Sequence, residues 1–108
     1  DRLFANLKKQ GIIVKTGYIL KSGDKYQEKG VDVQIAVDIC MKAVRNEYKR
    51  LILVSSDTDL IPAVKEARAL GKKVEYVGFD SHPSFALIRF SDSRTLLKKE
   101  DLLPFINK

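Results

Sequence analysis

Residues 51–60 read LILVSSDTDL, and this stretch decides the fold that the sequence predicts. Its first four residues form a continuous apolar run, which is typical of a strand buried on both faces of a parallel sheet. A helical pattern follows over residues 60–70, where Pro62 is tolerated because it lies in the first turn. The stretch therefore predicts a strand over residues 49–55 that leads through a polar turn into a helix.

Helical and strand-like segments alternate on both sides of this unit. Before it, the sequence predicts a helix over 2–10, a strand over 12–20, a loop over 21–30 and a helix over 31–46. After it come a strand over 73–79, a short helix or turn over 84–90, a short strand over 95–97 and a helix over 101–106. Such alternation predicts an α/β fold, with a mostly parallel sheet that carries helices on both faces in three α/β/α layers.

The helix over residues 31–46 is the most apolar of these segments. It carries an apolar stripe that we expect to pack on the sheet, formed by Val33, Ala36, Val37, Cys40 and Val44. Cys40 is the single cysteine of the chain, so no intrachain disulfide can form, and its place on the stripe indicates a core residue.

Composition limits the classes of protein to which the chain can belong. Its 108 residues fit one domain, and 44% hydrophobic with 31% charged residues is typical of a soluble globular protein. No apolar run approaches the roughly 18 residues that a membrane span needs, so no membrane partner is expected. The cysteine count and the lack of a secretory leader favour a cytoplasmic location.

The charge balance favours a polyanionic partner. There are 20 basic and 14 acidic side chains, a formal net charge of +6, which attracts nucleic acid at long range. A solvated, lysine-rich surface with no ligand is the alternative interpretation. The only histidine, His82, stands in a Ser-His-Pro loop and is interpreted as a surface residue.

The strongest candidates for chemistry are Asp57 and Asp59. They follow the buried strand, and ligands of open α/β sheets bind beyond the carboxyl ends of the strands. Two carboxylates one residue apart can converge there on a hard cation. The structural alternative is that Thr58 or Asp59 merely caps the following helix.

Two further aspartates lie on the helix over residues 31–46. Asp32 is in its first turn, where the helix dipole favours an acidic residue and where the side chain could also point toward Asp57. Asp38 is six residues further, about 120° around the helix, so the two cannot point the same way. A surface pair between Asp38 and Lys42 is the ordinary alternative.

These residues resemble the NYN domain family in order and spacing. The resemblance rests on KGVDV at residues 29–33, with Asp38 after it, on LVSSDTDL at residues 53–60, and on GKKV at residues 71–74. It implies a PIN-like, Rossmann-like fold and a divalent-metal-dependent endoribonuclease that hydrolyses RNA phosphodiester bonds. By resemblance, Asp32, Asp57 and Asp59 are catalytic and bind Mg²⁺ or Mn²⁺, and Asp38 matches a recurrent family acid of less defined role.

The same resemblance suggests how RNA is held. Ser55 or Ser56 would hydrogen-bond a ligand or the phosphate, and three lysines at the same rim would bind the RNA backbone: Lys21, Lys25 and Lys29. RNA is thus the expected partner, and whether the protein forms a homodimer is left open.

The chain departs from the family pattern in two places. Ser56 stands where the family usually has glycine. Family members also open with a strand ending in an Asp-x-Asn-like motif, which Asp1, followed by Arg-Leu-Phe, does not match. We therefore expect residues 1–108 to be a single NYN domain that is incomplete at its N-terminus, with one acid and one strand fewer than the family.

Two other functions compete with the nuclease. The first is a non-catalytic RNA-binding or regulatory protein on the same fold, which the shortened acidic set favours. The second is a receiver-like phosphotransfer domain, whose clustered aspartates also bind magnesium. Receivers need a lone phosphoacceptor aspartate and a distant lysine in a fixed strand order, an arrangement that this sequence does not show.

Overall fold

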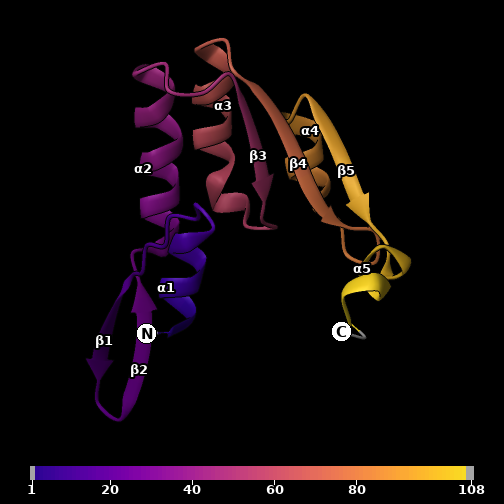
Figure 1. Cartoon of the computed structure of the whole chain (residues 1–108). Helices are drawn as coiled ribbons and strands as arrows, with labels where there is room; N and C mark the ends of the chain where they lie inside the picture. Colours follow the sequence, from indigo (N-terminus) through magenta and orange to yellow (C-terminus); the bar gives the residue numbers. More distant parts are fainter. Residues whose placement is uncertain (1, 107–108) are drawn as a thin grey trace. The chain divides into compact units, whose positions relative to one another are not determined.

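The structure is a computed structural model that describes residues 2–106 (Figure 1). Asp1, whose mismatch with the opening motif of the family is noted above, lies outside the described residues. The chain divides after Gln34 into two compact units. Within residues 2–106, no helix has both the length and the apolar character that a membrane span requires.

The first unit contains a helix and an antiparallel hairpin. Helix α1 spans Arg2–Lys9, as predicted, and the hairpin consists of β1, Tyr18–Ser22, and β2, Lys25–Lys29. Two predictions are therefore wrong here: residues 12–17 are not a strand, and most of the expected loop over 21–30 is one. A strand needs a partner for its backbone groups, and β1 finds it in β2 across a two-residue turn that begins with Gly23 at φ +63°.

The second unit is a parallel α/β arrangement, which helix α2 enters from the first unit. Its elements follow the predicted order: α2 Val31–Val44, β3 Arg50–Val54, a 3₁₀ turn η1 Thr58–Leu60, α3 Ile61–Ala69, β4 Lys73–Phe79, α4 Phe85–Phe90, β5 Ser93–Leu97 and α5 Lys99–Ile106. The sheet has the strand order β3-β4-β5, and both pairs of neighbouring strands are parallel (Figure 1). The prediction of a mixed α/β fold with a parallel sheet is confirmed.

The core of the second unit lies on one face of this sheet. Leu53 of β3 and Val74 and Tyr76 of β4 are buried there. Helices α2, α3 and α4 and the turn η1 complete the core with Ile39, Leu60, Ala63, Val64, Ala67 and Leu87. Within the Leu-Ile-Leu-Val run, the alternate residues Leu51 and Leu53 therefore meet this helical layer.

The opposite face of the sheet is open among the described residues of this unit. Ile52 and Val54 point to it and are 59% and 67% exposed, so the prediction that β3 is buried on both faces is wrong. On the same face, the carboxylate of Glu75 accepts hydrogen bonds from Arg50 and Thr95 on the two neighbouring strands. The described helices of the core all cover the other face, which is why these side chains meet solvent.

Helix α2 presents a different face to the core from the one predicted. Val33, Val37 and Val44 are exposed, whereas Ile39 and Ala43 are buried. Ala36 and Cys40 do pack against the core, beside Ile35. The helix is apolar around most of its circumference, so its sequence period could not select the buried side, and packing selected the row Ile35, Ile39 and Ala43 instead.

Candidate metal centre

The turn after β3 is organised by Asp57. Its backbone N–H donates to Ser55 Oγ at 3.1 Å, and its Oδ1 accepts from the N–H of Asp59 at 2.9 Å. Asp57 is thus the N-cap of η1, in extended conformation at φ −77° and ψ 110°. The structural alternative named Thr58 or Asp59 as the cap, and the structure corrects this to Asp57.

Asp32 lies in the first turn of α2, directly after a tight backbone turn. Gly30 adopts φ +92°, and a Cβ there would lie 2.8 Å from the ring of Tyr18, so only glycine fits without strain. The helix begins at Val31, which places the carboxylate of Asp32 at the positive end of the helix dipole. Lys29 and Asp32 line the same open pocket of about 470 Å³.

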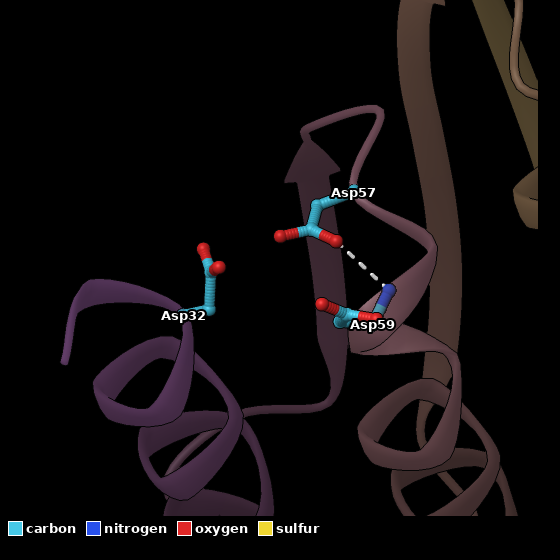
Figure 2. A group of neighbouring side chains, drawn as sticks. All are labelled: Asp32, Asp57 and Asp59. Carbon is cyan, nitrogen blue, oxygen red and sulfur yellow. Dashed lines mark hydrogen bonds between the residues drawn. The ribbon is translucent and has the colours of Figure 1, made fainter. Parts of the chain in front are cut away.

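Three carboxylates come together in this part of the chain. Asp32, Asp57 and Asp59 each offer one oxygen, and these oxygens all lie within 4.8 Å of one another (Figure 2). Asp32 and Asp59 are exposed, and Asp57 is half-buried. In Figure 2, one oxygen of Asp57 is engaged by the N–H of Asp59 and the other points toward Asp32. The group does not include Asp38, which is half-buried further along α2.

The two serines of the turn line a cavity that none of the three carboxylates lines. This cavity has a volume of about 330 Å³ and lies at the carboxyl ends of β3 and β4. Ser55 and Ser56 form its wall together with residues that the sequence analysis had assigned no function, among them Phe79 and His82. The only signal for these two was their position at or just beyond the carboxyl end of a parallel strand.

The three lysines proposed for RNA do not share one face of the hairpin. Cross-strand partners lie on the same face, so Lys29, opposite Tyr18, and Lys25, opposite Ser22, project to one side. Lys21 is opposite Tyr26 and projects to the other side, with its Nζ 5.7 Å from the centre of that ring. Of the three lysines, only Lys25 and Lys29 therefore share a face of the hairpin, and their role in RNA binding stays a prediction.

The comparison with known families decides the identity of this chain. The model of the NYN domain family matches residues 1–97. The chain belongs to the NYN domain family. The match contains the aspartates of the turn, Asp32 and the glycine-lysine run at residues 71–74, on which the resemblance was argued.

One solved structure is similar to this NYN protein. It is a crystal structure of a protein of unknown function from Vibrio parahaemolyticus RIMD 2210633, with a TM-score of 0.73 and 26% sequence identity. The similarity covers 92% of this chain and 61% of that one, so this chain spans less than two thirds of the other's length. None of the curated proteins matches the chain.

Proposed function

We propose that this NYN domain is a divalent-metal-dependent endoribonuclease that hydrolyses phosphodiester bonds of RNA. The observation that carries the proposal is the convergence of three carboxylates, from the first turn of α2 and from the turn after β3. Membership of the NYN family supports it, since the family resembles PIN-like nucleases. We further propose that Asp32, Asp57 and Asp59 are both the metal ligands and the catalytic residues.

The donor set fits Mg²⁺ or Mn²⁺. Both are hard cations that prefer oxygen ligands, and Mg²⁺ binds them at about 2.0–2.1 Å while keeping several waters. Two oxygens on opposite sides of such an ion lie about 4.2 Å apart. The separations of up to 4.8 Å therefore require either a small approach or a water between one carboxylate and the ion. A cation would also offset the repulsion among three negative charges at this distance.

In this proposal, Asp57 and the two serines of the turn have separate roles. A bound divalent ion would polarise the phosphate of the RNA and make a bound water molecule more acidic. Asp57 is held for its role by two hydrogen bonds, from its own N–H to Ser55 and from the N–H of Asp59 to Oδ1, which leave Oδ2 for the ion. Ser56 is exposed and would donate its hydroxyl to a phosphate oxygen, and Ser55 would do so only indirectly, through Asp57.

Binding of the RNA backbone is assigned to basic side chains. Lys25 and Lys29 share one face of the β1–β2 hairpin, and Lys29 lines the pocket that contains Asp32. We propose that these two contact phosphates next to the acids and that Lys21 contributes only to the long-range field. The net charge of +6 would attract RNA, and we propose a cytoplasmic location, which would give access to it.

The proposal includes the three-layer architecture of PIN-like domains. The helices of the core cover one face of the sheet, and parallel sheets are ordinarily covered on both. We propose that the other helical layer covers the opposite face around Ile52 and leaves the carboxyl ends of the strands, where Val54 lines a cavity, uncovered. That residues 1–108 form a single NYN domain stays a prediction.

A non-catalytic RNA-binding function is the second candidate. It is favoured by the cap role of Asp57, because a carboxylate that stabilises η1 has a structural reason to be there without a metal. The two candidates differ in what a metal does: it supports cleavage in the first and has no such effect in the second.

The experiment that tests the nuclease uses Asp57→Asn. Asparagine keeps an acceptor for the N–H of Asp59, so the cap and the fold survive, but one charge is removed from the cluster. Cleavage of a single-stranded RNA in Mn²⁺ should fall by roughly 100-fold or more, because one electrostatic contact to the transition state is lost. RNA binding should persist. Asp80→Asn, an exposed acid outside the cluster, serves as the control. Equal cleavage by wild type and Asp57→Asn would contradict the assignment.

A further inference from the structure

The cavity at the carboxyl ends of β3 and β4 is distinct from the carboxylate cluster. Its volume is about 330 Å³, and none of the three clustered aspartates lines it. All of its lining residues belong to β3, β4 and the turns that follow these strands. It is thus a feature of the second unit alone, whose parts are joined by the parallel sheet.

The walls of the cavity combine apolar surface with a few polar groups. Phe79 and Val54 contribute apolar side chains that are 46% and 67% exposed. Ser81 and His82, both exposed, add a hydroxyl and an imidazole that can donate or accept hydrogen bonds. An exposed aromatic ring with aliphatic neighbours and a few polar groups is the surface on which nucleic-acid bases stack.

The inner wall of the cavity is fixed in place. Tyr76 is fully buried, and its hydroxyl accepts the N–H of Ser84 at 3.0 Å. A Cβ at Gly78 would lie 2.0 Å from that hydroxyl oxygen, so the absence of a side chain at Gly78 lets the ring of Tyr76 take this position. This part of the wall is therefore in place before a ligand binds.

The cavity and the carboxylates share one turn of the chain. Ser55 and Ser56 line the cavity, and the next residue is Asp57, whose N–H donates to Ser55 Oγ. A ligand that contacts Ser55 or Ser56 therefore touches the chain one or two residues before Asp57, the acid that caps η1. In a nucleic acid strand, each base is likewise joined through its ribose to a neighbouring phosphate.

We propose that this cavity binds one unpaired nucleobase of the RNA whose phosphate lies at the carboxylates. The base stacks on Phe79, and Ser81 and His82 hydrogen-bond its edge. The inference rests on the proposed function and narrows its substrate class to single-stranded RNA, because a base within a duplex is stacked and cannot enter a side pocket.

The test compares two labelled single strands of equal length without divalent metal, one of RNA and one of abasic ribose phosphate. The wild type should bind the RNA more tightly than the abasic strand. Phe79→Ala should weaken RNA binding by about 5- to 100-fold, the usual effect of losing one stacking ring, and leave abasic binding unchanged. The matched control is Phe85→Ala, which removes a 76% exposed phenylalanine outside the cavity and should change neither affinity.

A further variant separates loss of stacking from loss of folding. Phe79→Tyr keeps the ring and should bind RNA within about twofold of wild type, while Phe79→Leu keeps apolar bulk and should resemble Phe79→Ala. Equal affinity of wild type and Phe79→Ala for RNA overturns the inference, as does equal binding of RNA and abasic strand by the wild type. If Mn²⁺-dependent cleavage persists in that case, the proposed nuclease stands without the base site. Base-dependent binding without cleavage leaves the base site and removes the nuclease.

Discussion

At the scale of single residues, Asp57 combines a structural and a proposed chemical role. One of its oxygens caps η1, and the other points toward Asp32. Capping and metal binding, which were alternatives for this turn with Thr58 or Asp59 as the cap, are thus compatible at Asp57 because a carboxylate has two oxygens. The contact with Ser55 fixes the backbone of the same residue, so its carboxylate is oriented before any ion or RNA arrives.

Gly78 carries a prediction at this scale. A methyl group there would lie 2.0 Å from the hydroxyl and 2.4 Å from the ring of Tyr76, which is fully buried and cannot move aside. Gly78→Ala should therefore lower the free energy of unfolding by about 1–3 kcal/mol, measured by urea denaturation. Combining it with Tyr76→Phe, which removes the closest atom, should cost less than the sum of the two single changes. Strictly additive losses would show that the two residues do not meet.

At the scale of elements, Asp92 ties the start of β5 to β4. Its Oδ2 accepts the N–H of the buried Val74 at 2.8 Å, its own N–H donates to the Val74 carbonyl, and Arg68 of α3 lies 3.1 Å from Oδ1. The backbone hydrogen bond from Val74, and then the charge of Arg68, lower the pKa of the Asp92 carboxyl. A lowered pKa stabilises the fold above the ordinary value of about 3.9, and this contribution is lost as pH falls through the lowered value.

Asp92→Asn should therefore show a pH-dependent loss of stability. Asparagine keeps an acceptor for Val74 but has no charge, so at pH 7 the free energy of unfolding should fall by about 1 kcal/mol. At an acidic pH below the lowered pKa, where the wild-type carboxyl is protonated, the difference between the two proteins should be smaller. Urea denaturation at both pH values measures it, with Asp80→Asn as an exposed control. A difference that does not change with pH would contradict the assigned cause.

The helices and strands of the fold, and the faces that they bury, could be predicted from the sequence only in part. The βα unit around residues 51–70 was predictable because an apolar run and a proline in a first turn act locally. The hairpin was missed because a lysine-rich segment becomes a strand only through its pairing partner. The buried face of α2 and the open face of β3 depend on which neighbours are present, and apolar character alone does not encode that.

The candidate site was predictable to a different extent. Asp57 and Asp59 follow from the rule that ligands bind at the carboxyl ends of parallel strands, and Asp32 follows from its place in the first turn of a helix together with the family resemblance. The cap role of Asp57 depends on backbone angles, which residue type alone leaves open. Phe79 and His82 carry no motif, and only the structure brings them to the cavity beside Ser55.

At the scale of the whole molecule, the net charge of +6 predicts how RNA binding responds to salt. Each phosphate neutralised by a lysine or arginine on a single strand contributes about −0.7 to the slope of log K against log salt. Lys25→Ala and Lys29→Ala should each make this slope shallower by about 0.7, whereas Lys65→Ala, on α3, should leave it unchanged. Titration of labelled RNA at several salt concentrations measures the slope. Binding that does not respond to salt would contradict a backbone contact.

The central claim is that Asp32, Asp57 and Asp59 hold one divalent cation together. Binding of Mn²⁺ to the whole protein, followed by electron paramagnetic resonance or titration calorimetry, tests this most directly. The wild type and Asp80→Asn should bind Mn²⁺ alike, and Asp32→Asn, Asp57→Asn and Asp59→Asn should each weaken that binding by at least about tenfold, because each removes one anionic oxygen ligand. Equal Mn²⁺ affinity in the wild type and these three variants would contradict the claim.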